Sequence, residues 1–90
     1  MKTVLATGKF KKDVKRYQNM PEKMKKLYGI IKLLAEGKIL PKENKPHMLA
    51  GNYSGFMECH IENDLLLIWL DDVGQTIKLI RLGTHSELFK

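Results

Sequence analysis

Six consecutive apolar residues, Leu65 to Leu70, constrain the fold of this 90-residue chain more than any other feature. A run of this length is too short to span a membrane and is typical of a central strand that is buried on both faces. The segment Asp71–Gln75 follows it and has the acidic and glycine residues of a hairpin turn. We therefore predict that residues 76–82 return as the neighbouring antiparallel strand.

The stretch before this run, residues 56–61, alternates in polarity as a half-buried strand does. Successive side chains of a strand point to opposite faces of the sheet. Met57, Cys59 and Ile61 form the apolar set and are expected to face the core. Because of this alternation, the His60 side chain is expected on the face of the sheet that the helices leave open.

The first half of the chain has the spacing of two amphipathic helices. The first helix is predicted over residues 11–18, and the second between Pro21, which suits a first helical turn, and Gly37. Their apolar stripes consist of Phe10, Val14 and Tyr17 in the first helix, and Met24, Leu27, Ile31 and Leu34 in the second.

Three further segments complete the predicted order. Residues 2–7 read as a short first strand, residues 37–46 as a polar connecting loop, and residues 84–89 as a tail with room for one helical turn. The chain is therefore predicted to be a single α+β domain over residues 1–90, in the order β-α-α-β-β-β. In this fold a two-helix hairpin packs on one face of a small antiparallel sheet.

The net charge of +6 is concentrated in the first half. Residues 1–45 hold 13 Lys/Arg against 4 Asp/Glu, whereas residues 46–90 hold 3 against 6. A basic half indicates a polyanionic partner, although lysines also serve simply to keep helices soluble. The lysines expected to contact such a partner are Lys11, Lys12, Lys15, Lys23, Lys25 and Lys26.

The single cysteine and the distribution of apolar residues indicate the cellular compartment. Cys59 is the only cysteine, so an intramolecular disulfide and a four-thiolate zinc site are excluded. The first eight residues have too few apolar side chains for a signal peptide, and no run is long enough for a membrane span. We expect a soluble cytoplasmic protein.

All three histidines, His47, His60 and His85, lie in the second half together with Asp64 and Arg81. Imidazole is suited to proton transfer near neutral pH, and a guanidinium is suited to phosphate. The histidine spacings match no local zinc-binding motif, so we expect no metal. The pattern indicates chemistry on a phosphodiester.

Plainer explanations exist for each of these side chains. His60 also fits a half-exposed strand histidine without a role, and Asp64 either fixes the tautomer of His60 or merely begins the next strand. Arg81 is expected on the same strand face as the apolar residues of its strand, where it either lines a cleft or pairs with Glu58 or Asp64.

Three ordered sets of residues resemble the RelE/YafQ toxins of bacterial toxin–antitoxin pairs, in the YafQ branch. They are His47-x-Leu49-x-Gly51, Phe56-x-Glu58-x-His60-Ile61-Glu62-x-Asp64-Leu65-Leu66-Leu67-Ile68, and Arg81-Leu82-Gly83-Thr84-His85-Ser86-Glu87-Leu88-Phe89. The resemblance implies a ribosome-dependent endoribonuclease that cuts mRNA, uses no metal or cofactor, and is neutralised by a cognate antitoxin. The implied functional positions are His47, His60, Asp64, Arg81, His85 and Phe89.

The chain departs from that family pattern at three positions. Met57 stands where relatives usually carry arginine, Asn63 where proline is usual, and Trp69 where tyrosine is frequent. Loss of the arginine removes one potential phosphate contact.

The residue types allow a mechanism to be assigned as a hypothesis. His60, oriented by Asp64 and assisted by His47, removes a proton from the RNA 2′-OH. Arg81 stabilises the phosphoryl charge, His85 is the general acid, and Phe89 either stacks on a base or anchors the C-terminus. The alternative is a non-catalytic RNA-binding or protein-interaction module, which has no use for converging histidines.

Overall fold

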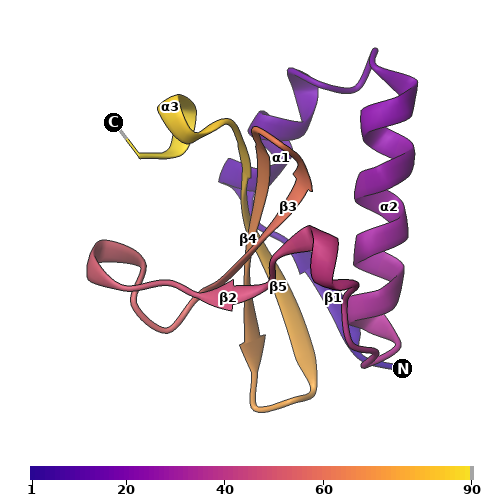
Figure 1. The fold of residues 1–90 in the computed structure, drawn as a ribbon. Coiled ribbons are helices and arrows are strands. Elements are labelled where there is room, and N and C mark those ends of the chain that lie inside the picture. Colours follow the sequence, from indigo (N-terminus) through magenta and orange to yellow (C-terminus); the bar gives the residue numbers. More distant parts are fainter. Residues whose placement is uncertain (90) are drawn as a thin grey trace.

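A computed structural model describes residues 1–89 as a five-stranded sheet with two main helices (Figure 1). The strand order across the sheet is β1-β5-β4-β3-β2. The elements are β1 (Thr3–Ala6), α1 (Gly8–Lys15), α2 (Pro21–Ala35), η1 (Lys42–Asn44), β2 (His47–Met48), η2 (Gly51–Tyr53), β3 (Met57–Glu62), β4 (Leu65–Asp72), β5 (Thr76–Gly83) and α3 (His85–Leu88).

The predicted α+β arrangement is confirmed, with two additions at the edges of the sheet. β1 pairs with β5 in parallel, so the sheet is mixed, and the two-residue strand β2 extends the other edge. β1 and β5 are distant in sequence, so no tight hairpin forces an antiparallel orientation upon them. The predicted helical turn after β5 is present as α3.

One face of the sheet is covered by the two main helices. Thr7 accepts a hydrogen bond from the Phe10 amide and so begins α1 three residues earlier than predicted. On α2, Ile30 is buried, whereas Ile31 of the predicted stripe is only partly buried. Within residues 1–89 no helix is long and apolar enough to cross a membrane.

The opposite face carries a second, smaller core. Leu66 and Ile68 of β4 are fully buried there against Leu88 of α3, with partly buried residues of the loop between β2 and β3 around them. Figure 1 shows α3 and this loop on the side of the sheet away from α2. Leu67 and Trp69 meanwhile face the helices. The prediction that β4 is buried on both faces is therefore confirmed.

An irregularity in β5 changes which side chains face the helices. Ile68 pairs with Arg81 but Trp69 pairs with Leu79, so Ile80 is an extra residue in β5. Such a bulge shifts the alternation of the strand by one position. Arg81 consequently shares a face with Ile68, and the prediction that it shares one with Leu79 is wrong.

Candidate active site

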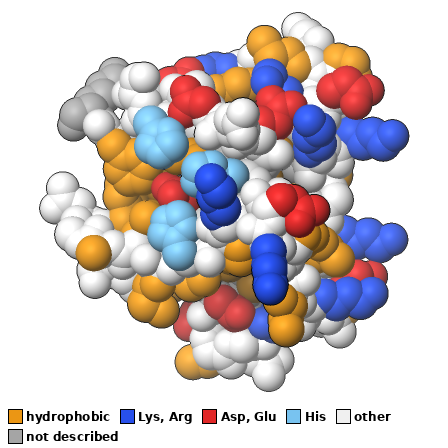
Figure 2. All heavy atoms as spheres, viewed as in Figure 1, with side chains coloured by type: hydrophobic (Ala, Val, Ile, Leu, Met, Phe, Trp, Pro, Cys, Tyr) orange, Lys and Arg blue, Asp and Glu red, His pale blue; other side chains and the backbone are white. Residues whose placement is uncertain are grey.

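Cross-strand pairing brings His47, Glu58 and Arg81 into one row on the face of the sheet opposite the helices. His47 of β2 pairs with Glu58 of β3, which pairs with Ile68 of β4, which in turn pairs with Arg81 of β5. His60 lies two residues beyond Glu58 on the same strand, and so on the same face. Figure 2 shows the three histidines of the chain gathered on one face, with acidic and basic groups among them.

His85 is held by Asp64 at the end of this site. The Asp64 carboxylate accepts a hydrogen bond from the His85 amide at 3.0 Å and lies 2.9 Å from Nδ1 of its ring. The backbone hydrogen bond, followed by the ring contact, lowers the pKa of Asp64. Leu66 pairs with Gly83; Asp64 precedes Leu66 by two residues in the β3–β4 turn, and His85 follows Gly83 by two residues at the start of α3.

Asp64 was expected to orient His60, but its carboxylate contacts His85 instead. The strand register accounts for this, because it aligns the β3–β4 turn with the start of α3. The ring of His60 nevertheless lies close by, with its centroid 6.0 Å from that of His85. The structure therefore brings His60, Asp64 and His85 together, in a different pairing from the predicted one.

His47 pairs with a buried glutamate that sequence reasoning did not include in the site. Nε2 of His47 is 3.1 Å from Oε1 of Glu58, and Nδ1 is 2.8 Å from the Lys45 carbonyl oxygen. Both ring nitrogens thus face oxygen atoms, and these two contacts fix the orientation of the ring. Glu58 is 4% exposed, and its other oxygen is buried without a hydrogen-bond partner among the described residues. The sequence signal for Glu58 was an acid on the strand face of His60.

The ion-pair partner of Arg81 is Asp13 of α1, and not Glu58 or Asp64 as considered from the sequence. Nε of Arg81 lies 2.7 Å from the carboxylate, which also accepts the Leu82 amide at 2.9 Å. The hydrogen bond between the Arg81 guanidinium and the Asp13 carboxylate raises the pKa of Arg81. Asp13 is the only acid in residues 1–20 and lies three residues after Phe10 on the apolar stripe, a signal that sequence reasoning missed.

Hydrogen bonds of Glu87 connect α3 to the turn that follows α1. It completes a capping box with Thr84, whose amide it accepts at 2.8 Å, and it accepts the Tyr17 hydroxyl at 2.5 Å. Burial, and then the hydrogen bond to Glu87, raise the pKa of Tyr17, while the same bond lowers the pKa of Glu87. A Cβ on Gly83 would approach Glu87 Oε1 to 2.8 Å, so a larger residue there would displace the Glu87 carboxylate from its hydrogen bonds. Glu87 therefore connects α3, which carries His85, to the turn that follows α1.

Phe89 lies beside His85, as the predicted role requires. Their ring centroids are 6.2 Å apart, and the ring of Phe89 meets that of Tyr53 edge-on at 5.6 Å. Phe89 is 42% exposed, so one surface of the ring is free for a ligand.

The lysines predicted to bind RNA differ in their surroundings. Lys23 and Lys26 both contact Glu62, at 2.9 Å for Lys26, and this lowers the pKa of Glu62. Figure 2 shows basic side chains along the side of the molecule formed by α2. The exposed members of the set are Lys11, Lys12, Lys15, Lys25 and Lys26.

Cys59 is unsuited to nucleophilic chemistry. It is fully buried, as its place in the alternating strand predicted, and burial raises the pKa of its thiol to about 12. Among residues 1–89, no group of three or more His, Cys, Asp or Glu side chains is arranged to hold a metal ion.

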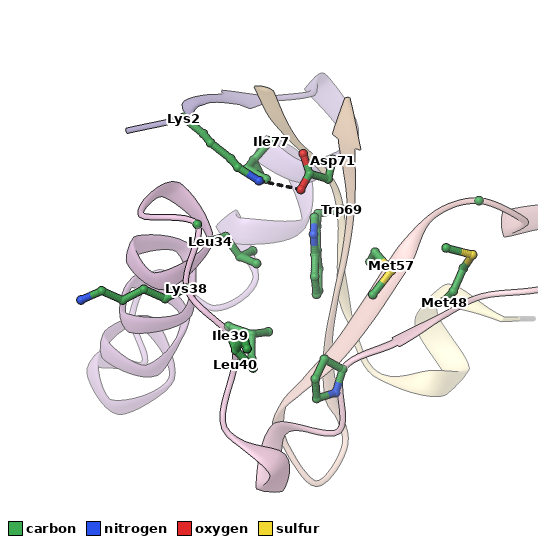
Figure 3. A pocket seen from close by; sticks show the side chains of 13 residues that line it. Lys2, Leu34, Lys38, Ile39, Leu40, Met48, Met57, Trp69, Asp71 and Ile77 are labelled. Atoms are coloured by element: carbon green, nitrogen blue, oxygen red, sulfur yellow. Dashed lines mark hydrogen bonds and ion pairs between the residues drawn. The ribbon is translucent and has the colours of Figure 1, made fainter. Parts of the chain in front are cut away.

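Met57 lies on the other face of β3 from Glu58 and His60. It pairs with Trp69, and both line a groove of about 410 Å³ between the sheet and the end of α2 (Figure 3). Two of the three departures from the resembled pattern therefore meet in this groove. The methionine removes no charged group from the histidine face.

Known proteins resemble this chain over nearly its whole length. It matches a family model described as a bacterial toxin of a type II toxin–antitoxin system, YafQ, over residues 2–90. The mRNA interferase toxin YafQ of Escherichia coli K12 is 36% identical over 85 residues, which cover 92% of this chain and 90% of the relative.

Two solved structures have the same fold. A metal-bound toxin from Helicobacter pylori is 39% identical and superposes with a TM-score of 0.89, covering 99% of this chain and 100% of that one. The toxin in the E. coli DinJ–YafQ toxin–antitoxin complex is 32% identical, with a TM-score of 0.87 and coverage of 99% and 98%.

Fold and sequence together define the class of protein as a bacterial toxin of a type II toxin–antitoxin system. Within that class, the chain belongs to the YafQ family.

Proposed function

We propose that this toxin is an mRNA interferase that cleaves ribosome-bound mRNA by acid–base catalysis without a metal. The observation that carries the proposal is the gathering of His60, His85 and Arg81 on one face of the sheet, with the His47–Glu58 pair beside them. The curated E. coli relatives are mRNA interferase toxins, which supports the reaction class.

RNA supplies its own nucleophile, the 2′-OH, so the protein has four tasks. It must align that oxygen with the phosphorus, remove its proton, stabilise the negative phosphoryl oxygens and protonate the departing 5′-oxygen. Imidazole and guanidinium groups suffice for the last three tasks.

Arg81 is the proposed phosphate ligand. Asp13 holds its Nε and Nη2, at 2.7 and 3.3 Å, so the guanidinium is kept in one orientation before substrate arrives. The strand bulge at Ile80 turns it towards the histidines. Such preorganisation favours the transition state because little rearrangement remains to be made.

His85 is the proposed general acid. In the proposed step the ring is an imidazolium: Asp64 accepts a hydrogen bond from Nδ1–H, and the proton on Nε2 is delivered to the 5′-oxygen. Phe89, on the next turn of the chain, stacks on a base beside the scissile bond.

His60 is the proposed base for the 2′-OH. His47, oriented by Glu58 and the Lys45 carbonyl, assists as a second acceptor of the proton. This arrangement replaces the Asp64–His60 pair expected from the sequence.

The proposed partners follow from charge and from the relatives. Exposed lysines of α1 and α2 contact ribosomal RNA phosphates, which makes association sensitive to salt. A cognate antitoxin neutralises the toxin, as DinJ assembles with the E. coli YafQ. Action on ribosome-bound mRNA places the protein in the cytoplasm.

The test is cleavage of mRNA on purified ribosomes by wild type and by His85→Ala and Arg81→Ala. Each variant is expected to lose roughly 10²–10⁴-fold in rate. Lys78→Ala removes a cation from the same strand as Arg81, one that pairs with Asp72 near the β4–β5 turn, and serves as control. Wild-type rates in both site variants would favour the alternative, a non-catalytic RNA-binding or interaction module.

Two further arms address the remaining claims. The same mRNA without ribosomes is expected to resist cleavage, and equal cleavage of free RNA would remove the ribosome dependence. A chelator of transition metals that spares Mg²⁺ should leave the rate unchanged, whereas loss of activity restored by added metal would contradict metal-free chemistry.

A further inference from the structure

A hollow of about 540 Å³ lies next to the histidine face and has no role in the proton transfers. Its lining consists of Ala50, Asn52, Tyr53, Leu88 and Phe89. Two aromatic rings and two aliphatic side chains form its apolar surface, and Asn52 provides its uncharged polar side chain. This composition is typical of a site for a flat, partly polar ligand.

The two rings of the hollow form a right-angled corner. Tyr53 and Phe89 have an interplanar angle of 82° and centroids 5.6 Å apart. A flat ligand that stacks on one ring therefore meets the other ring with its edge. Stacked and edge-on contacts are the two favourable arrangements of aromatic groups.

The corner is directly connected to the groups that act on the phosphate. Phe89 packs against His85, with centroids 6.2 Å apart. After Asp13, the Tyr53 side chain also contributes to raising the pKa of Arg81, so it lies near the guanidinium. A nucleotide whose phosphate lies at Arg81 and His85 thus has its base within reach of this corner.

The loop that carries Asn52 and Tyr53 is closed by its own backbone. Leu49 donates its amide to the Phe56 carbonyl at 2.8 Å, and Ser54 and Phe56 donate to Gly51 and Tyr53 at 3.0 Å each. Tyr53 is further packed against Phe56, with centroids 6.0 Å apart. Asn52 remains exposed at the tip of η2. The corner therefore has a formed wall and an exposed amide.

We propose that this corner binds one unpaired base of the nucleotide flanking the scissile phosphate, and that Asn52 reads the edge of that base. The inference rests on the proposed function and adds a determinant of sequence preference to it. A carboxamide offers one donor and one acceptor side by side, which matches some base edges and leaves others unpaired. Aromatic stacking binds every base, whereas the amide discriminates among them.

The first experiment compares cleavage of ribosome-bound mRNAs that differ only in the base next to the cut. In Asn52→Ala, the ratio of kcat/KM between the most and least favoured base should fall at least about fivefold, the lower value of one bidentate contact. Asn19→Ala, an exposed asparagine between α1 and α2, is the matched control. An unchanged ratio in Asn52→Ala would overturn the assignment of the amide.

The second experiment measures binding on the folded wild-type protein. A 2′-deoxy dinucleotide, which lacks the nucleophile and stays intact, is titrated while the NMR signals of the Asn52 amide and the Tyr53 and Phe89 rings are followed. An abasic dinucleotide is the control. Shifts at all three side chains that require the base support the proposal, and shifts confined to lysines and Arg81 overturn it.

These results separate the inference from the proposed function. Base-dependent shifts in a protein that does not cleave mRNA would refute the nuclease but leave the base site standing. If the protein cleaves mRNA but the signals of the corner do not respond to the base, the base site is refuted and the nuclease remains supported. Tyr53→Leu is expected to raise KM about 5- to 100-fold through lost stacking, with Tyr53→Phe retaining most of it.

Discussion

Arg81 donates from Nε to the carboxylate of Asp13 across 2.7 Å, although 68 residues separate them in the chain. The first helix therefore supplies the counter-charge of a residue at the far end of the sheet. The same carboxylate also accepts the Leu82 amide at the part of β5 beyond its pairing with β1. One acidic side chain thus links α1, β5 and the proposed phosphate site.

Asp13→Ala should destabilise the protein by about 3–5 kcal/mol, because it leaves a largely buried guanidinium without its partner. Urea unfolding followed by circular dichroism measures the change. Asp72→Ala breaks an exposed pair with Lys78 and should cost at most about 1 kcal/mol. Equal losses in the two variants would mean that the Asp13–Arg81 pair is energetically no different from a surface pair.

The Tyr17–Glu87 hydrogen bond should make stability depend on acid pH. The folded-state pKa of Glu87 is lowered, so its contribution is complete above the ordinary glutamate pKa near 4.5 and is lost as pH falls through the lower folded value. Tyr17→Phe should therefore be less stable than wild type at pH 6, with the difference shrinking towards pH 3. Unfolding curves across this range measure it, and a difference independent of pH would contradict the linkage.

The thiol of Cys59 should be inert in the folded protein. Its pKa of about 12 leaves almost no thiolate at pH 8, and the side chain is fully buried. A thiol reagent is expected to react only after denaturation, at one equivalent per chain. Rapid reaction of the native protein would show that β3 opens readily.

Met57→Arg restores the residue usual at that position yet should leave mRNA cleavage within a few-fold of wild type. The side chain faces the groove shared with Trp69, on the helix side of the sheet. Ribosome assays beside wild type measure the rate, and thermal unfolding monitors the cost of a cation in an apolar wall. A large gain in cleavage would place position 57 in contact with RNA.

The element order and the two faces of β3 were predictable because they depend on local periodicity. The buried run of β4, the alternation that exposes His60 and buries Cys59, and the helical stripes are all read within a few residues. Each was confirmed to within small shifts at the element ends.

The pairings within the site depended on features that periodicity does not encode. Asp64 meets His85 because of strand register, and Arg81 changes face because of a single extra residue. Asp13 lies among lysines in sequence, and only the packing of α1 against β5 brings it to Arg81. The sequence therefore allowed the site residues to be predicted more readily than the contacts between their side chains.

Because of the bulge at Ile80, the alternation of side chains between the two faces of the sheet shifts by one residue near the end of β5. Every residue of β5 that follows it points to the side opposite the one that uninterrupted alternation would assign. Without the bulge, the same residues would pair Ile80 with Ile68, which would direct Arg81 into the hydrophobic layer under the helices and Leu82 out of it. At this end of the sheet, strand register decides as much as side-chain identity whether a charge lies on the histidine face or in the interior.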